Sequence, residues 1–295
     1  MISQQGHEDA ILIVGGDSMV GTITAHHLTQ AGFAVRATTR RPAAAGPDRP
    51  FVDLAAGMWD RLGDGRFRAA VLCAAVARVA DCRRDPAATA AVNVTGTVGL
   101  ATWLARRGTP VLLLSTNHVF DGSRPQRPAG DPTCPASEYG RQKAAAEAAV
   151  LGLPRGSVLR LTKVVHPGLP LFDGWAADLR AGRPIAPFSD FPFAPVTADL
   201  VARTIRSILA AGCGAGIWQL SAPDDITYAD AALHIARSLG CDPALVRPVA
   251  GVAHTMMGGE QPSRCTSLDT TRVRDELKLT PPSAVEAIAT CLDHR

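Results

Sequence analysis

The 295-residue sequence predicts an α/β fold with a doubly wound parallel sheet. Short, continuous apolar runs alternate with longer segments of helical composition, as strands covered by helices on both faces require. A glycine-rich turn joins the first apolar run to the first helical segment. Polar and small residues follow several of the apolar runs, at the strand ends where ligands bind in such sheets.

The composition indicates a globular protein. Hydrophobic residues make up 46% and charged residues 19% of the chain, and the net charge of +3 is too small to predict nucleic-acid binding. No apolar run reaches the ~20 residues of a membrane span. Because the polar start Met1–Ala10 lacks the apolar core of a signal peptide, we expect a cytoplasmic protein. The seven cysteines lack C-x-x-C spacing, so we expect reduced thiols and no metal site.

The first strand, expected over Ala10–Val14, leads into G-G-D-S-M-V-G and a helix that runs to Gly32. Strand, glycine turn and helix together are typical of a dinucleotide site, where backbone N–H groups face the diphosphate. Ser18 occupies the place of the central glycine and narrows the diphosphate approach. The candidate cofactor-binding residues of this turn are Gly15, Ser18, Met19, Val20 and Gly21.

The second strand, expected over Phe33–Thr38, is followed by Thr39, Arg40 and Arg41. Sites that prefer NAD place an acid here for the ribose 2′-hydroxyl, whereas an arginine accommodates a 2′-phosphate. The sequence therefore favours NADP(H), with Arg40 and Arg41 as its ligands. A solvated basic turn is the alternative.

Two further strands and a long helix complete the first half. We expect strands at Phe51–Leu54, where Asp53 and Leu54 could meet the adenine, and at Arg68–Ala75, where Ala74 and Ala75 permit close passage of a cofactor. A helix is expected over Asp85–Gly108, with Pro86 near its start and a glycine at its end. Asn93 is the unusual polar residue inside this helix, and it either supports the active site or satisfies backbone groups.

The buried strand that begins at Val111 ends in Ser115 and Thr116, and a proline-rich loop and a further helix follow it. Tyr139 and Lys143 are four residues apart, so a helix puts both on one face. An ammonium group beside a phenol favours the phenolate, and a hydroxyl from Ser115 or Thr116 can bind the same substrate oxygen. This combination predicts a general acid or base for a carbonyl or an alcohol.

The C-terminal half predicts a smaller mixed lobe. We expect residues 1–165 to form the dinucleotide-binding domain and 166–295 the substrate lobe, with 196–221 returning to the first domain. Arg183 and Arg264 are candidate diphosphate ligands. The expected elements are strands Ser157–Leu161 and Ile217–Ser221, a loop Pro184–Pro195, helices Phe172–Gly182, Asp199–Ala211 and Tyr228–Leu239, and a tail Thr270–Leu292 that is helical in two pieces.

These residues resemble the extended short-chain dehydrogenase/reductases, a Rossmann-fold group, and within it the dTDP-4-dehydrorhamnose reductase family. Ser115–Gly122 reads S-T-N-H-V-F-D-G where the family has S-T-D-Y-V-F-D-G, and Tyr139–Lys143 reads Y-G-R-Q-K for Y-G-R-T-K. Ala91–Asn93 matches A-V-N, and Leu159–Val164 resembles L-R-T-S-W-V. Gln261–Asp269 resembles the closing pattern more loosely.

The resemblance implies an NADPH-dependent reductase of a nucleotide-linked 4-keto sugar. Thr116, Tyr139 and Lys143 match the family's catalytic residues. Tyr139 is then the acid that protonates the C4 oxygen, Lys143 binds the nicotinamide ribose, and Thr116 polarises the ketone. The expected partner is the nucleotide-sugar substrate, and a homodimer is left open.

Departures from the family pattern concern the substrate pocket. Asn117 and His118 replace the aspartate and tyrosine of the motif, Ala77 replaces a tyrosine, and Lys163 replaces a tryptophan. Asn117, His118 and Lys163 are thus candidate substrate-binding residues, together with Arg183 and Arg264. We expect a related keto sugar rather than dTDP-4-dehydrorhamnose itself.

Two alternatives remain at this point. The same residues serve epimerases, and also dehydratases, although a dehydratase places an acid where this chain has Asn117. A non-catalytic NADP-binding regulatory subunit, like that of methionine adenosyltransferase, is the alternative from another class.

Overall fold

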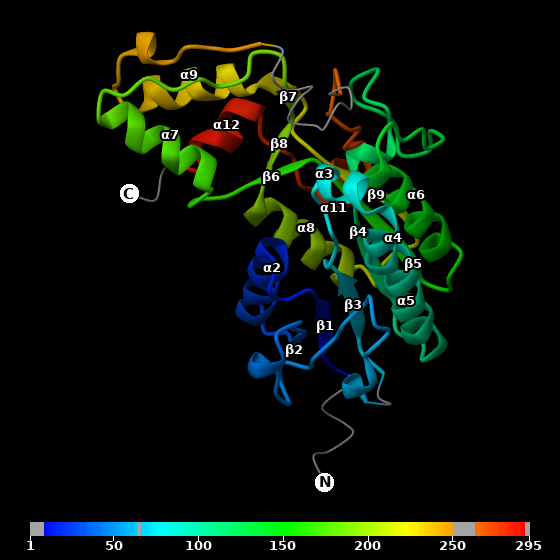
Figure 1. Cartoon of the computed structure of the whole chain (residues 1–295). Coiled ribbons are helices and arrows are strands. Elements are labelled where there is room, and N and C mark those ends of the chain that lie inside the picture. The colour runs from blue at the N-terminus through cyan, green and yellow to red at the C-terminus, as the bar shows by residue number, and fades with distance from the viewer. Residues whose placement is uncertain (1–8, 64–65, 251–262, 293–295) are drawn as a thin grey trace. The chain divides into compact units, whose positions relative to one another are not determined.

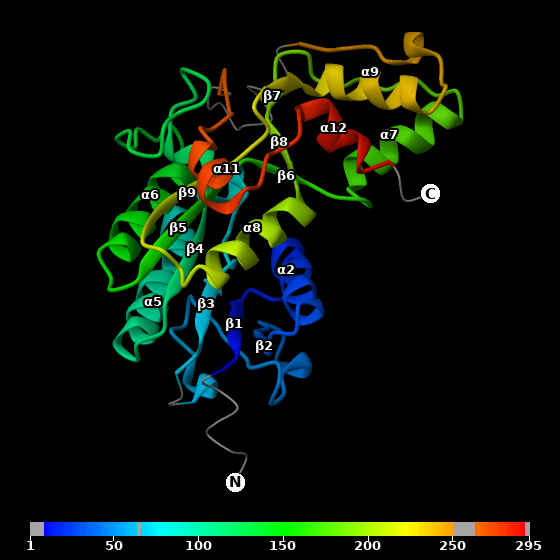
Figure 2. The same cartoon turned by 180° about the vertical axis from the view of Figure 1, so that it is seen from behind.

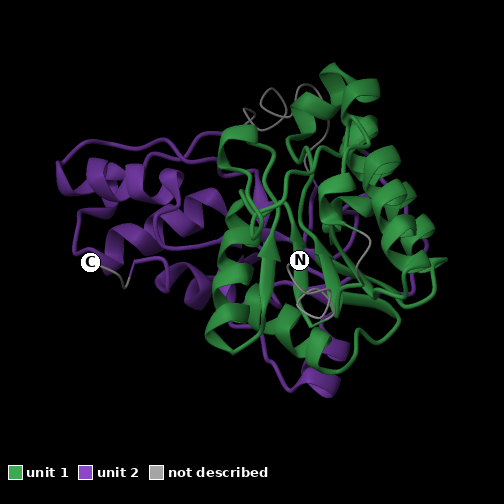
Figure 3. Ribbon diagram, turned by 90° about the horizontal axis from the view of Figure 1, so that it is seen from below, with its two compact units in different colours: residues 1–119, 137–160, 201–218 green, residues 120–136, 161–200, 219–295 purple. Residues whose placement is uncertain are grey.

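The computed structural model describes residues 9–63, 66–250 and 263–292 (Figure 1). The start of the loosely matching pattern at Gln261 and Pro262 lies outside these ranges. The chain divides into two compact units (Figure 3). Unit 1 comprises residues 1–119, 137–160 and 201–218, and unit 2 comprises 120–136, 161–200 and 219–295.

A six-stranded sheet with the order β2-β1-β3-β4-β5-β9 is the centre of unit 1. Strand β1 pairs in parallel with β2 on one side and with β3 on the other, and β3 pairs in parallel with β4. The strand that follows β1 in sequence, β2, lies on one side of it, and the later strands lie on the other side. This change of side creates a crevice at the carboxyl ends of β1 and β3. The predicted doubly wound fold is confirmed. The strands are β1 (Ile11–Val14), β2 (Val35–Ala37), β3 (Ala69–Leu72), β4 (Val111–Thr116), β5 (Gly156–Leu161) and β9 (Gly216–Leu220).

Helices cover both faces of this sheet. Helix α2 (Met19–Gln30) lies on one face, and α5 (Thr97–Arg106) and α6 (Glu138–Leu151) lie on the other (Figure 1 and Figure 2). Alternate residues of the strands, among them Leu12 and Leu113, pack with α5 and α6 in one buried cluster. The strands are apolar throughout because both faces are covered.

The expected strand Phe51–Leu54 is wrong. Only isolated bridges form here, between Thr39 and Phe51 and between Asp53 and Met58. The Asp53 carboxylate accepts hydrogen bonds from the backbone N–H groups of Ala55 and Ala56 at 2.9 and 3.3 Å. This local turn competes with strand pairing, so the segment bends away.

The expected helix Asp85–Gly108 is confirmed, as a continuous helix of three segments from Pro86 to Arg106. They are α4 (Pro86–Ala90), the π-helix η3 (Ala91–Gly96) and α5, and a further short helix, α3 (Val79–Arg84), precedes them. The π-helical turn contains Asn93, whose side chain bonds the backbone of Val76. A Cβ on Gly96 would lie 2.0 Å from the Leu54 carbonyl oxygen, so glycine permits the close approach of this turn.

Unit 2 is a mixed α/β unit with two small sheets. Strand β6 (Lys163–Val165) pairs in parallel with β8 (Pro195–Thr197), and β7 (Pro192–Phe193) pairs antiparallel with β10 (Ile226–Thr227). The segment expected to be a loop, Pro184–Pro195, therefore contains a short strand. The helices of this half are α7 (Pro170–Arg180), α8 (Ala198–Ala210), which reaches into unit 1, α9 (Tyr228–Ser238), α11 (Thr271–Leu277) and α12 (Ala284–Ala289).

Tyr228 is the centre of the core of unit 2. Its ring stacks on those of Phe193 and Phe191, with centroid distances of 4.4 and 5.5 Å, and meets Trp175 edge-on. Within the described part of the chain, none of the helices has the length and hydrophobicity that crossing a bilayer would take. The remaining short helical turns are η1 (Pro42–Ala44), η2 (Asp60–Leu62), η4 (Asn117–Val119) and η5 (Pro243–Leu245).

Candidate active site

A cavity of about 630 Å³ opens in unit 1 at the carboxyl ends of β1 and β3. The cofactor residues predicted from the sequence that line it are Gly15, Ser18, Arg40, Arg41, Asp53, Leu54, Ala74 and Ala75. Met19, Val20 and Gly21 are not among its lining residues and belong to the first turn of α2. The cavity is therefore built by the segments that the glycine motif and the basic turn indicated.

The glycine turn brings three strand ends together. Gly15 has φ +89°, and a Cβ there would lie 2.7 Å from the backbone N of Ala74 at the end of β3. The Gly15 N–H donates to Thr38 Oγ1 at 3.0 Å, which ties the turn to the end of β2. A Cβ on Gly21 would lie 2.3 Å from the Gly15 carbonyl oxygen. Glycine is required at both positions because the backbones are in direct contact.

Ser18 is the N-cap of α2. Its hydroxyl accepts a hydrogen bond from Gly21 N at 3.1 Å and donates one to the Gly15 carbonyl at 2.7 Å. The side chain is thus held within the turn, as is usual for an N-cap serine. Its effect on the approach of a diphosphate stays a prediction.

Asp17 is a cavity residue that the sequence reasoning missed. It lies between the glycines of the motif, but its carboxylate accepts from Thr39 Oγ1 at 2.7 Å and from Arg40 N at 3.2 Å. An acid thus stands at the end of β2 although the strand itself supplies none. An acidic residue inside the glycine turn was the only available signal.

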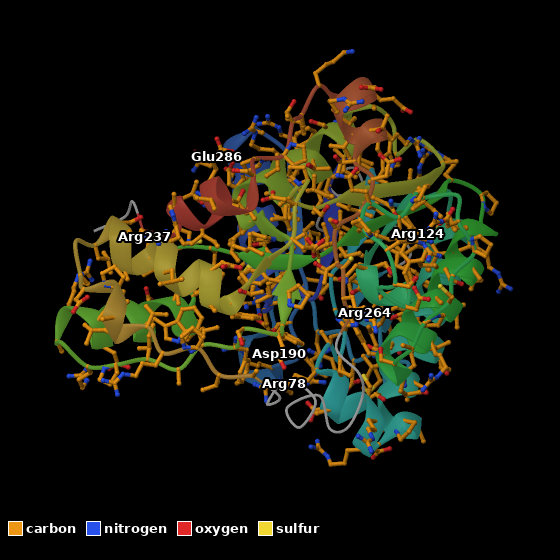
Figure 4. All side chains as sticks on the ribbon, turned by 90° about the horizontal axis from the view of Figure 1, so that it is seen from above. Arg78, Arg124, Asp190, Arg237, Arg264 and Glu286 are labelled. Carbon is orange, nitrogen blue, oxygen red and sulfur yellow. The ribbon has the colours of Figure 1, made fainter. Side chains whose placement is uncertain are left out.

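Arg78, Asp81 and Val76 also line the cavity and were not singled out from the sequence. Val76 and Arg78 lie between β3 and α3, and Asp81 lies in the first turn of α3. Asn93 holds this stretch, because its amide accepts from Val76 N at 2.8 Å and donates to the Val76 carbonyl at 2.9 Å. The side chains of the described residues, Arg78 and Arg264 among them, are drawn in Figure 4.

Thr116, Tyr139 and Lys143 lie together in unit 1. Thr116 is the last residue of β4, and Tyr139 and Lys143 both lie on α6. The helix is capped by Ser137, whose hydroxyl accepts a hydrogen bond from Gly140 N at 3.1 Å. Tyr139 is 8% exposed and Lys143 2%. The Lys143 ammonium donates to the Leu114 carbonyl at 2.7 Å, so the helix face that carries the pair is turned toward the end of β4.

Burial is the main cause of the pKa shifts of Tyr139 and Lys143. Burial raises the pKa of Tyr139, and a side-chain hydrogen bond with Thr116 opposes that rise only in part. Tyr139 is therefore a protonated phenol at neutral pH, which is the form that a general acid needs. Burial lowers the pKa of Lys143 to about 8, against the opposite effects of Glu147 and Cys73.

His118 and Asn117 adjoin Thr116, and the His118 ring also contacts Tyr139. The His118 ring meets Tyr139 edge-on at a centroid distance of 5.9 Å, and its backbone N–H donates to Thr116 Oγ1 at 3.2 Å. Burial lowers the pKa of His118, so its ring is neutral at pH 7. Asn117 Oδ1 lies 3.5 Å from Thr116 Oγ1. The sequence signal for both residues was their departure from the family motif.

The other candidate substrate residues lie in unit 2. Lys163 is the exposed first residue of β6. Arg183 forms an ion pair with Asp178 at 2.7 Å, and the Arg264 backbone N–H donates to the Gly122 carbonyl at 3.1 Å. Their contact with a substrate stays a prediction. Among the described residues, no group of three or more potential metal ligands occurs.

Comparison with known proteins places this architecture in a family. Residues 9–295 match the model described as RmlD substrate binding domain. The dTDP-4-dehydrorhamnose reductase of Streptomyces griseus is 32% identical over 253 residues, which cover 82% of this chain and 80% of that protein. The probable low-salt glycan biosynthesis reductase Agl14 of Haloferax volcanii is 31% identical over 228 residues, or 74% of each chain.

Solved structures share the fold at low identity. The dTDP-4-dehydrorhamnose reductase of Bacillus anthracis, solved in complex with NADP, superposes with a TM-score of 0.84 at 16% identity and covers 98% of this chain and 100% of that one. The UDP-glucose 4-epimerase of Thermotoga maritima gives 0.79 at 19% identity, covering 97% and 98%.

Proposed function

The chain belongs to the RmlD substrate binding domain family, and from this premise we propose that it is an NADPH-dependent reductase of a nucleotide-linked 4-keto deoxysugar. The observation that carries the proposal is the buried group of Thr116, Tyr139 and Lys143 in the same unit as the cavity at the glycine turn. The curated relatives named above are reductases, which favours net reduction.

The residues of the cavity fit a dinucleotide. Gly15 has no side chain and lies against the Ala74 backbone, and Ser18 holds its hydroxyl within the turn, which together support a diphosphate at the start of α2. Arg40 and Arg41 line the cavity after β2, which supports them as ligands of a 2′-phosphate. Asp53 and Leu54 line it too, which supports a contact with the adenine. NADPH, when bound, supplies the hydride that reduces the ketone.

The three residues Thr116, Tyr139 and Lys143 then supply the proton and orient the reacting groups. Tyr139, whose pKa is raised by burial, holds the proton that the developing C4 alkoxide takes. Thr116 donates a hydrogen bond from its hydroxyl to the same oxygen, which polarises the ketone. Lys143, anchored on the Leu114 carbonyl, binds the nicotinamide ribose and orients it toward Tyr139.

The proposed substrate is a nucleotide-linked keto sugar other than dTDP-4-dehydrorhamnose. His118 and Asn117 border the catalytic group, and they replace an aromatic residue and an acid of the family motif. Ala77 stands where the family has a tyrosine, and Lys163 stands where it has a tryptophan. We therefore expect less stacking on the sugar nucleotide. Lys163, Arg183 and Arg264, all in unit 2, stay candidate ligands of its diphosphate.

The first test is a fluorescence titration with NADPH and NADH of the wild type and of Arg40→Ala. We expect NADPH to bind and the variant to bind it more weakly, while its NADH affinity changes little. Turnover is then measured as NADPH oxidation with a panel of nucleotide-linked 4-keto sugars. Absence of nicotinamide binding would contradict the reductase proposal. Binding without oxidation of NADPH by any keto sugar would favour a non-catalytic NADP-binding subunit.

A further inference from the structure

Asp17 joins the glycine turn to the end of β2. Its Oδ2 accepts from Thr39 Oγ1 at 2.7 Å and from the backbone N–H of Arg40 at 3.2 Å. The side chain is 22% exposed and lines the cavity beside Ser18. The carboxylate therefore lies at the strand end where dinucleotide sites recognise the adenine ribose.

The same carboxylate binds two arginines. Arg49 Nη2 donates to Asp17 Oδ1, and Arg41 Nη2 lies 3.5 Å from that oxygen. Both guanidinium groups remain substantially exposed, at 45% and 70% for Arg49 and Arg41. Cationic groups that could bind a phosphate are thus already paired with a carboxylate of the chain.

The carboxylate is ionised at neutral pH. Burial by itself would raise the pKa of Asp17, but hydrogen bonds from Thr39, the Arg40 backbone and Arg49, with the charge of Arg41, lower it below its ordinary value. A fixed negative charge therefore stands among Arg40, Arg41 and Arg49.

We infer that Asp17 sets the preference of this site between NADPH and NADH, by competing with the 2′-phosphate for Arg41 and Arg49 and by offering an acceptor to a free ribose 2′-hydroxyl. The inference rests on the proposed function, since it concerns the adenosine end of the same cofactor site. The acid that NAD-preferring sites place on β2 is here supplied by the turn after β1.

The electrostatic argument gives the direction. A phosphate monoester carries a charge of about −1.5 to −2 at pH 7. It is attracted by Arg40 and Arg41, which line the cavity, and by Arg49, which pairs with Asp17. It is repelled by the Asp17 carboxylate, which also lines the cavity. The 2′-hydroxyl of NADH bears no charge and can donate to the carboxylate. Asp17 thus weakens the selectivity for NADPH that the arginines alone would produce.

The test isolates this end of the cofactor. Calorimetric affinities for 2′,5′-adenosine diphosphate and for 5′-adenosine monophosphate are measured on the full chain, and their ratio reports the 2′-phosphate contribution. We expect Asp17→Asn to raise this ratio on the order of tenfold, because it removes the charge and keeps an acceptor oxygen. Asp17→Ser is a second charge-removing variant in case the asparagine disturbs the turn. Asp48→Asn is the matched control, since Asp48 lies on the same loop as Arg49 and interacts with Arg36 instead.

The ratio is informative even if a variant binds both ligands less well. An unchanged or lowered ratio in the Asp17 variants overturns the inference, as does an equal rise in Asp48→Asn. Failure of wild type and variants alike to bind 2′,5′-adenosine diphosphate overturns it as well. The proposed function fails by a different result, namely a wild-type chain that binds neither NADPH nor NADH.

Discussion

Asn93 and Gln142 share a buried hydrogen bond of 2.9 Å, from the Asn93 amide to Gln142 Oε1. The bond joins the π-helical turn to α6, one residue before Lys143. Gln142 also donates to Thr89 Oγ1 at 3.0 Å, and Asn93 holds both backbone groups of Val76. A π-helical turn inside an α-helix frequently marks a functional site. Here it couples a wall of the cavity to the helix that carries the catalytic pair.

Asn93→Ala is expected to destabilise the chain by about 1–3 kcal/mol, because the Val76 backbone groups and Gln142 Oε1 lose the hydrogen bonds that Asn93 makes with them. The KM for NADPH is also expected to rise, since Val76 lines the cavity. Urea unfolding and steady-state kinetics measure the two effects. Asn93→Asp keeps the acceptor for Val76 N–H and is expected to be intermediate. An unchanged KM in Asn93→Ala would mean that this network has no role at the site.

Tyr139→Phe is expected to lower kcat by about 10²–10⁴-fold, the usual contribution of a general acid. NADPH affinity should change little, because the substitution removes only the hydroxyl. The chain has one other tyrosine, and Tyr228→Phe is the matched control, since Tyr228 is buried among aromatic rings of unit 2. Retention of kcat within a few-fold in Tyr139→Phe would remove Tyr139 from the mechanism.

Activity is expected to fall as the pH rises above about 8, where Lys143 loses its proton. The ammonium form donates to the Leu114 carbonyl, and in the proposed function it is the form that binds the cofactor ribose. Its pKa is lowered by burial, so this loss occurs well below the ordinary lysine value. The pH dependence of kcat/KM for NADPH measures the alkaline limb. A profile that stays flat to pH 10 would show that the charge of Lys143 is not needed.

Glu147→Gln is expected to cost about 3–5 kcal/mol of folding stability, because it leaves the Arg160 guanidinium buried without its charged partner. The pair is 2.7 Å apart and both side chains are 2% exposed. Glu276→Gln, at the exposed ion pair with Arg272, is the matched control and should cost less than about 1 kcal/mol.

The same Glu147→Gln variant tests the charge of the catalytic lysine. Glu147 raises the pKa of Lys143 against the effect of burial, so its neutralisation should move the alkaline limb of kcat/KM to lower pH. An unmoved limb, measured at a temperature where the variant is folded, would contradict this coupling.

Sequence reasoning succeeded where the signal was local. The glycine turn predicted the connection from β1 to α2, and the spacing of Tyr139 and Lys143 predicted one helix for both. The basic residues after β2 line the cavity, and their contact with a cofactor stays a prediction. Sequence reasoning failed at Phe51–Leu54, where the Asp53 side chain binds backbone groups and overrides strand propensity, and it did not predict the π-helical segment around Asn93 inside the expected helix. Strand alternation and helical period contain no information about such competing bonds.

The sequence by itself determined the fold class, the family and the catalytic residues as candidates, because periodicity and short motifs are properties of the local chain. Only the tertiary structure decided which polar side chains form hydrogen bonds with one another. Asp17 and Thr39 are 22 residues apart, and Asn93 and Gln142 are 49 apart. Contacts at such separations depend on how turns and helices pack around the sheet. The position of Asp17 at the end of β2 and the hydrogen bonds of Asn93 to Val76 and Gln142 therefore became visible only in three dimensions.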